Sequence, residues 1–256
     1  MTMYKSLTKN DYQKMLKLPN NYQIDGVLSY GHYDLKKQLD RLKKSLSNLN
    51  IDYQITQLNG YLQNILEIKT PKSTFWFAVV YGGVTLGEYL HFACLFGSKK
   101  NIHIGSCGGL YPQMNSLDYL VPIWSYGNES STRFYARNNT ENIHYPNKGL
   151  SDQLKAKLVN ERAWEGPVIT CAAMVAETKG DVDKWTKKGY YGVEMETSTI
   201  FAVSNHFDVP SAALLYVSDN LVKGEMVGDE NHNKQKEIRY QRAQKMLDVA
   251  VEVLLN

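Results

Sequence analysis

Asn101-Ile102-His103-Ile104-Gly105-Ser106-Cys107-Gly108-Gly109 is the stretch that decides the fold. Its first four residues predict a short strand, which we expect to end abruptly at the glycine-rich segment that follows. The backbone N–H groups of such a segment and the Ser106 hydroxyl suit an anion at the carboxyl edge of a sheet. A tight turn that needs small residues is the structural alternative. The segment is neither a G-x-G-x-x-G fingerprint nor a P-loop.

Strand and helix patterns alternate on both sides of this stretch, which is typical of an α/β sheet covered by helices on both faces. The predicted strands are 27–29, 53–58, 61–68, 74–80, 101–104, 120–124, 168–171, 192–194 and 211–217. The predicted helices are 35–49, 85–96, 151–162, 196–206 and 234–255. Asn59-Gly60 predicts a hairpin turn, and residues 126–148 predict a long polar loop. We expect one α/β domain over residues 25–256, preceded by an N-terminal extension over residues 1–24.

The composition excludes several classes of protein. The 256 residues are 43% hydrophobic and 21% charged with 3 Cys, which excludes disordered and disulfide-scaffold chains. The net charge is only +3, and the strongest basic cluster, residues 36–44, alternates with leucines as a solvated helix face does. Nucleic acid is therefore not an expected partner.

No apolar run reaches the roughly 18 residues of a membrane span and no signal peptide is evident, so we expect a cytoplasmic protein with no membrane partner. Without metal-ligand spacing, no metal is expected.

Two acidic residues close a second predicted strand, in Gly192-Val193-Glu194-Met195-Glu196. Their spacing sends Glu194 and Glu196 to the same side if the strand persists. A carboxylate at this edge can accept two hydrogen bonds from a diol, which is a common way to hold a ribose. The structural alternative is that Glu196 only favours the N-terminus of the following helix.

A third polar segment, Ser218-Asp219-Asn220, follows the buried strand 211–217. Alone, Asp219 reads as a helix cap or turn former. Together with Ser106 and Glu196, however, it places polar groups at three strand ends, where open α/β sheets bind their ligands. The three strand ends therefore predict one ligand site.

The order and spacing of these segments resemble the nucleoside phosphorylase/nucleosidase superfamily, which includes purine nucleoside phosphorylase, uridine phosphorylase and methylthioadenosine nucleosidase. Residues 96–110 resemble its phosphate-loop strand, 193–196 its ribose-binding signature, and 216–219 the catalytic segment of its purine-specific members. The resemblance runs from about Gly26 to the C-terminus. It implies a mixed sheet or distorted barrel flanked by helices, and an enzyme that cleaves the N-glycosidic bond of a nucleoside.

The resemblance also implies roles for single residues. Asp219 would donate a proton to N7 of the departing purine, with Ser218 beside it, and Glu196 would hold the ribose 2′- and 3′-hydroxyls. The remaining substrate-binding positions are Met195 under the sugar, Glu194, Gly83 and Val175, the last where the family often has an aromatic residue over the base. The phosphate-binding positions are Ser106, Gly31, His103 and Gly105. Inorganic phosphate is the implied co-substrate, no other cofactor is expected, and a homo-oligomer, dimer or hexamer, is implied.

The chain departs from the family at two phosphate-binding positions. His103 stands where the phosphorylases usually carry an arginine, and Gly31-His32-Tyr33-Asp34-Leu35 stands in place of a G-D-P-x-R element. The loss of two bidentate cations weakens phosphate binding. Cations that a loop can supply instead are Lys36, Arg133 and Arg137.

Phosphorolysis of a purine nucleoside is the function that the sequence favours. The segment 126–135 resembles the phosphorylase branch, and Ser218-Asp219 resembles the purine-type acid. The first alternative is hydrolysis of the same bond by a nucleosidase, with Asp34 as the base that activates water. The second is a nucleoside-binding protein that has kept the fold and lost catalysis.

Overall fold

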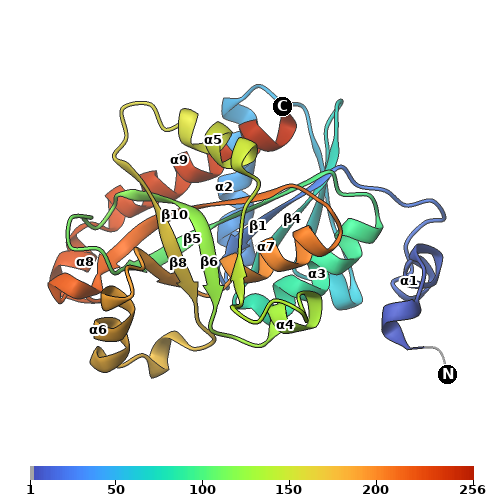
Figure 1. The fold of residues 1–256 in the computed structure, drawn as a ribbon. Helices are drawn as coiled ribbons and strands as arrows, with labels where there is room; N and C mark the ends of the chain where they lie inside the picture. Colours follow the sequence, from blue (N-terminus) through green and yellow to red (C-terminus); the bar gives the residue numbers. More distant parts are fainter. Residues whose placement is uncertain (1–2) are drawn as a thin grey trace.

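Four parallel strands form the centre of the computed structural model, which describes residues 3–256 (Figure 1). They lie in the order β4 (Thr74–Val80), β1 (Gly26–Gly31), β5 (Lys100–Gly109) and β10 (Ser211–Asn220). Two antiparallel strands extend the sheet beyond β4: β3 (Ile65–Lys69) and β2 (Gln54–Gln57). The β2–β3 connection contains Asn59-Gly60 and a single turn of 3₁₀-helix, η2 (Gly60–Leu62), so the predicted hairpin is confirmed.

The other half of the sheet closes on itself. Starting from β5, the ring continues through β9 (Gly192–Glu194), β8 (Ala163–Thr170) and β6 (Tyr119–Gly127) to β10, which pairs with β5 again. The short β7 (Ile143–His144) pairs with β6 outside this ring. The expectation of an α/β fold with a mixed sheet or distorted barrel flanked by helices is therefore confirmed.

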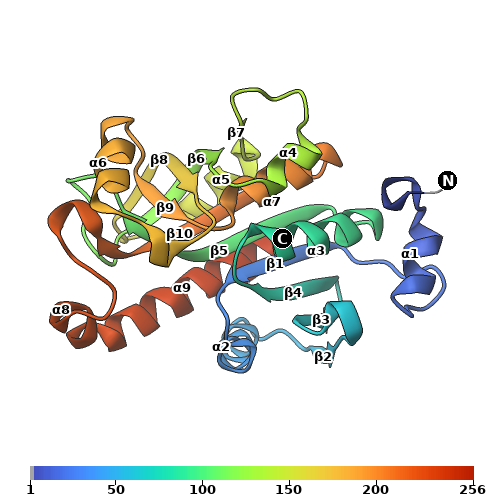
Figure 2. The same ribbon diagram turned by 90° about the horizontal axis from the view of Figure 1, so that it is seen from below.

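Helices cover both faces of the sheet (Figure 2). On one face lie α2 (Leu35–Asn48), α5 (Lys148–Ala156) and α9 (Lys236–Leu255). On the other lie α3 (Gly83–Leu95), α4 (Ser131–Tyr135) and α7 (Thr197–His206). At the end of the barrel away from the N-terminus lie α6 (Lys179–Lys187) and α8 (Glu230–Lys234), with the 3₁₀ turns η3 (Met174–Ala176) and η4 (Leu221–Lys223) in the same half of the chain. Within residues 3–256, no helix combines the length and the apolar character that a membrane crossing needs.

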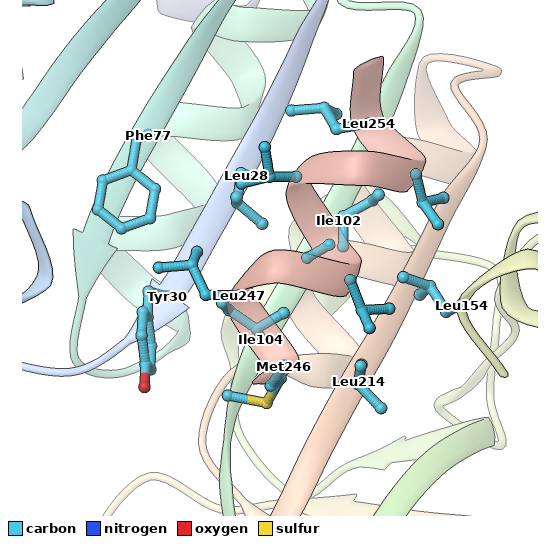
Figure 3. Packing of buried hydrophobic residues seen from close by; sticks show 14 of the residues in the cluster. Leu28, Tyr30, Phe77, Ile102, Ile104, Leu154, Leu214, Met246, Leu247 and Leu254 are labelled. Atoms are coloured by element: carbon cyan, nitrogen blue, oxygen red, sulfur yellow. The ribbon is translucent and has the colours of Figure 1, made fainter. Parts of the chain in front are cut away.

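The larger core lies between the sheet and α9 (Figure 3). Strand residues two apart point to one face, so Ile102 and Ile104 of β5 line up with Leu28 of β1 and Leu214 of β10. These four side chains are fully buried. They pack in one cluster with the apolar face of α9, of which Met246, Leu247 and Leu254 are part. Burying each such side chain contributes about 1.5–3 kcal/mol, and the parallel strands are therefore held firmly at the edge where the site lies.

Residues 3–24 pack against the second core, on the α3 side. The helix α1 (Lys9–Met15) begins at Thr8, whose hydroxyl accepts the N–H of Asp11, and it buries Tyr12 against α3. Further along, the Tyr22 hydroxyl accepts a hydrogen bond from Trp76 Nε1 at 2.8 Å. The segment predicted as an N-terminal extension is thus packed against the sheet and α3.

The structure corrects the prediction of where two strands end. β5 does not stop at Gly105 but continues to Gly109, because β10 pairs with it on one side and β9 on the other. β10 likewise runs on to Asn220, with a register shift between Val217 and Asp219. The predicted end of this strand at Ile104 is therefore wrong, and the tight turn considered as the alternative for residues 105–109 is strand as well.

Two further predictions are corrected. The helix predicted over 151–162 is α5, which begins at Lys148 because the Asn147 side chain accepts the N–H of Leu150. The long loop predicted over 126–148 contains α4 and β7. In addition, the basic face predicted for α2 is not wholly solvated, because Arg41 is only 6% exposed.

Candidate active site

Glu196 lies at the centre of the site, at the start of α7, and is 5% exposed. Its Oε1 accepts the backbone N–H of Gly82 at 2.5 Å, and its Oε2 lies 3.8 Å from His103 Nε2. Gly82 has φ +95°, which a side chain rarely permits, and it caps α3 directly after β4. The turn after β4 thus brings a backbone donor onto the carboxylate.

Glu194 holds the start of the same helix. Its Oε2 accepts the backbone N–H groups of Glu196 at 2.7 Å and Thr197 at 2.6 Å, and its Oε1 accepts the Thr170 hydroxyl. Both oxygens are therefore engaged within the protein. Glu194, predicted to bind substrate, is placed where it fixes the backbone that carries Glu196.

Burial and mutual repulsion favour the protonated forms of this pair. Burial and the neighbouring Glu194 raise the pKa of Glu196 to about 8, and burial also raises the pKa of Glu194. Burial lowers the pKa of His103 to about 3, so this imidazole is neutral. This group of residues therefore carries less charge at neutral pH than its residue types suggest.

The two carboxylates and His103 are also the group best arranged for a metal ion among the described residues. One ligand atom from each lies within 4.8 Å of the others. The oxygens of Glu194 already accept three internal hydrogen bonds, however, which leaves only Glu196 and His103 with free ligand atoms. Two free ligands fit a metal poorly, since protein sites usually supply three or more.

Gly31 and Gly105 frame the space between His103 and Glu196. A Cβ at Gly31 would lie 3.1 Å from Glu196 Oε2 and 3.4 Å from His103 Cε1. A Cβ at Gly105 would lie 3.3 Å from His103 Nε2. The structure therefore brings together four of the predicted residues: Gly31, His103, Gly105 and Glu196.

Asp219 lies on β10 and is also 5% exposed. The Ser218 hydroxyl lies within hydrogen-bonding reach of Asp219 Oδ1 and of the Cys107 carbonyl. Burial raises the pKa of Asp219, and the charge of His232 opposes the rise. A buried carboxyl of this kind is suited to deliver a proton.

Three further titratable residues, Cys107, Glu177 and Tyr81, are affected by the charges of these carboxylates. Burial, together with the charges of Glu194 and Asp219, raises the pKa of the Cys107 thiol. Burial and the charge of Asp219 raise the pKa of Glu177 to about 7. Burial, together with the charges of Glu196 and Glu177, raises the pKa of Tyr81. Glu177 is thus near Asp219, and Tyr81 is near Glu196 and Glu177. The sequence analysis missed Glu177, for which its position two residues after Val175 was the available signal.

Ser106 is exposed and lies beside Tyr216, its direct partner across the β5–β10 ladder. Because it follows His103 by three residues on a strand, its side chain points to the opposite face. Burial raises the pKa of Tyr216, while the charges of Arg239 and Arg41 and a hydrogen bond with Ser106 oppose the rise. Ser106 is therefore next to Tyr216, a residue on which two arginine charges act.

Arg41 is a buried cation on α2. Its guanidinium donates to the Tyr30 hydroxyl at 3.1 Å and to Gln38 Oε1 at 3.2 Å, and it lies 4.6 Å from the centre of the Tyr240 ring. Its Nε is buried without a hydrogen-bond partner. Arg137, one of the loop cations considered above, instead lines a groove between α1, α3 and α4.

The remaining predicted residues are placed less centrally. Val175, in η3, is 91% exposed, and Met195 is half-buried between the two carboxylates. Gly83 lies in the first turn of α3, where a Cβ would come within 2.3 Å of Thr199 Oγ1. Gly83 therefore permits close packing of α3 on α7. Asp34 caps α2, since its Oδ1 accepts the N–H of Lys37 at 3.0 Å.

The fold is consistent with the phosphorylase class of proteins. A sequence model of the phosphorylase superfamily matches residues 88–255, which include β5, β9, α7 and β10. The chain belongs to the phosphorylase superfamily, a superfamily of enzymes. This confirms the family that the sequence motifs predicted.

The individual relatives share a low sequence identity with this chain. The chain is 26% identical over 165 residues to a guanosine phosphorylase of Halorubrum lacusprofundi, covering 62% of this chain and 65% of that protein. It is 23% identical over 165 residues to a DeoD-type 2 purine nucleoside phosphorylase of Photobacterium profundum, covering 63% and 66%. A protein of the same description from Vibrio vulnificus is 22% identical over 211 residues, covering 77% and 86%. The chain thus spans slightly less than two thirds of the length of the first two relatives.

The raised pKa of Glu196 should make the stability of the folded protein depend on pH. Because the pKa of Glu196 is raised from 4.5 to about 8, the folded protein keeps a proton that the unfolded chain releases between these values. The free energy of unfolding should therefore fall as the pH rises from 5 to 8, and Glu196→Gln should remove about 3 kcal/mol of that fall. Urea unfolding at several pH values, followed by tryptophan fluorescence, measures it.

The matched control is Glu141→Gln, because Glu141 is exposed. This variant should show the pH dependence of the unsubstituted protein. Equal slopes for Glu196→Gln and the unsubstituted protein would contradict a raised pKa at Glu196.

Proposed function

We propose that this chain cleaves the N-glycosidic bond of a purine nucleoside with inorganic phosphate, releasing the free base and ribose 1-phosphate. The observation that carries the proposal is the buried Asp219, whose pKa burial raises and whose charge acts on Glu177, a residue that acts together with Glu196 on Tyr81. A buried acid with a raised pKa and a carboxylate that can accept from a diol are the two groups that this reaction needs. Membership of the phosphorylase superfamily and the names of the relatives support the same reaction.

The bond changes assign a task to each end of the site. An oxygen of phosphate forms a bond to C1′ of the ribose while the bond from C1′ to N9 breaks. The electron pair of that bond passes into the purine, which becomes basic at N7. Asp219 delivers its proton to N7, and this removes the negative charge of the leaving base.

Glu196 would hold the ribose by accepting its 2′- and 3′-hydroxyls. These donors favour the ionised carboxylate, so sugar binding should lower the pKa of Glu196 from its value of about 8 in the empty site. The free energy for this comes from desolvated, charge-assisted hydrogen bonds, which are stronger than neutral ones.

Phosphate would lie beside Ser106 and Tyr216. Arg239 and Arg41 act on Tyr216 and supply positive charge near this face of β5. We propose them in place of the two arginines that the motifs lack. The Ser106 hydroxyl would then donate directly to a phosphate oxygen.

Hydrolysis is the second candidate, and one observation favours it. His103 stands at the position of a phosphate-binding arginine and is neutral, with a pKa of about 3 caused by burial. Against hydrolysis, the Asp34 carboxylate already serves as the cap of α2. Water would therefore need another base.

The deciding experiment incubates the purified protein with inosine, guanosine, adenosine and methylthioadenosine, each with and without phosphate, and follows both base and sugar products. Phosphate-dependent release of ribose 1-phosphate is the expected result. Free ribose at a rate indifferent to phosphate would make the chain a nucleosidase. Binding of nucleosides without any release would leave only a nucleoside-binding protein.

Ser106→Ala should raise KM for phosphate about tenfold, because one hydrogen bond to a charged group is lost, and should leave KM for the nucleoside within about twofold. Initial rates over a phosphate series at saturating nucleoside measure this change. Ser47→Ala is the matched control, since Ser47 is exposed on α2. A change in nucleoside KM alone would move Ser106 out of the phosphate site.

A further inference from the structure

We propose that Ser29 and His103 form a hydrogen-bonded relay that positions Glu196, so that His103 serves the sugar end of the site and not the phosphate. The kinetic part of this inference rests on the proposed function, in which Glu196 accepts the ribose hydroxyls. The part that concerns the relay itself is a property of the folded protein. His103 is thereby a positioning residue, acting through Glu196.

The first contact of the relay is between β1 and β5. Ser29 and His103 are direct partners across this parallel ladder, and both are fully buried. Ser29 Oγ lies 3.0 Å from His103 Nδ1. The Ser29 hydroxyl has one hydrogen to donate, either to His103 Nδ1 at 3.0 Å or to the Ile102 carbonyl at 3.4 Å. We assign it to the shorter contact, and because a neutral imidazole has one donor and one acceptor nitrogen, this places the ring hydrogen on Nε2.

The second contact is longer than a hydrogen bond. His103 Nε2 is buried and has no hydrogen-bond partner, and it faces Glu196 Oε2 at 3.8 Å. A distance of 3.8 Å is too long for a hydrogen bond, and catalytic hydrogen bonds commonly tighten when substrate binds. An N–H left without an acceptor in the interior is costly, so a small movement of Glu196 toward the ring is favourable.

The glycines on either side keep this gap open. Neither Gly31 nor Gly105 has a Cβ, and each Cβ would lie within 3.4 Å of the ring or the carboxylate. The carboxylate and the ring can therefore approach each other without displacing another side chain.

The charges around Glu196 explain why a neutral donor matters. Glu196 faces Glu194 from β9, His103 from β5, the Gly82 N–H from the start of α3 and Tyr81 from the turn after β4. Glu177 lies next in line, acting on Tyr81. Among these described neighbours none is a permanent cation, so the ionised form of Glu196 depends on hydrogen-bond donors. His103 supplies one donor, and the two sugar hydroxyls would supply the others.

Two matched substitutions separate the relay from a phosphate-binding role. The side-chain amide of Gln can reach the position of the histidine Nε2, whereas that of Asn can reach only the position of Nδ1. His103→Asn should raise KM for a purine ribonucleoside about tenfold, the effect of one lost hydrogen bond to a charged group, and leave KM for phosphate within about twofold. His103→Gln should stay within about threefold of the unsubstituted protein in both values. An increase in phosphate KM alone would overturn the relay.

NMR of the labelled protein tests the relay without any activity. In the unsubstituted protein, the side-chain nitrogens of His103 should report a hydrogen on Nε2, and Ser29→Ala should weaken this preference. The Glu196 side-chain carboxyl should titrate at higher pH in His103→Asn, because a donor to its ionised form is lost, and nearly unchanged in His103→Gln. A hydrogen on Nδ1, or an unchanged Glu196 titration in His103→Asn, would overturn the proposal.

The two tests keep the failure of each idea distinct. If no nucleoside is cleaved while the Glu196 titration moves as expected, the proposed function fails and the relay stands. If nucleosides are cleaved and the titration does not move, the relay fails alone. Circular dichroism checks that each variant folds, and His103→Gln with Ser29→Ala carries the test if His103→Asn does not.

Discussion

Asp219→Asn should lower kcat for the phosphorolysis of a purine ribonucleoside about 1000-fold, because general acid catalysis contributes about 10²–10⁴ in rate. Asn keeps the size of the side chain and its contact with Ser218 but has no acidic proton. KM should change little, since Asp219 acts on the base only as it departs. Steady-state rates at saturating phosphate measure the effect.

The rate of the unsubstituted protein should also depend on pH through Asp219. Burial raises the pKa of this carboxyl, so the protonated form persists to higher pH than usual and is lost as the pH rises further. The chemical step should therefore slow on the alkaline side, and Asp219→Asn should lack this limb.

A substrate that needs no proton provides the control. 7-Methylguanosine carries a positive charge on its imidazole ring and leaves as a neutral base, so its cleavage should be nearly equal in Asp219→Asn and the unsubstituted protein. Asp183→Asn, on the exposed side of α6, should change neither substrate's rate. An equal loss for inosine and 7-methylguanosine would contradict the role of Asp219 as the acid.

Glu196→Gln should lower kcat/KM for a purine ribonucleoside about 100-fold, since two charge-assisted hydrogen bonds to the ribose are weakened. The amide group also offers a donor toward the Gly82 N–H or toward the sugar, where an acceptor is needed in both places. Most of the loss should appear in KM, because the hydroxyls bind in the ground state as well as in the transition state.

Sugars without these hydroxyls isolate the contact. With a 2′,3′-dideoxynucleoside, the unsubstituted protein and Glu196→Gln should differ by less than about threefold in kcat/KM, because the hydrogen bonds under test are absent. A 100-fold difference that persists with the dideoxy substrate would show that Glu196 acts on something other than the ribose hydroxyls.

Local patterns predicted most of the elements. The apolar run 74–80 corresponds closely to β4, which is buried on both faces, and the leucine spacing of 35–49 to α2, which is buried on one face. These two kinds of burial leave different periodicities of apolar residues in the sequence. The continuation of β5 through Gly105–Gly109 was not predictable in the same way. Glycine favours turns locally, and only pairing with β9 and β10, far along the chain, keeps this segment extended.

The site was predictable to the extent that its residues follow strands. Glu196 and Asp219 could be found because each stands where a strand meets the sheet edge. Glu177 had only one sequence signal, its position two residues after Val175, since it follows an irregular 3₁₀ turn with no periodic pattern and its approach to Asp219 depends on tertiary packing. The sequence predicts Arg41 on a solvated helix face, because the spacing of residues does not reveal its contacts with Tyr30 and Tyr240.

β5 belongs to both parts of the sheet, and this affects how the domain unfolds. This strand pairs with β1 in the open part of the sheet and with β9 and β10 in the closed ring, so detaching it breaks both parts at once. Its amide hydrogens should therefore exchange with solvent only when the entire domain unfolds, whereas the exposed turn around Val175 can open alone. His103 and Ser106 are thus carried by a strand that opens only with the whole domain, while the turn around Val175 can fluctuate without loosening it.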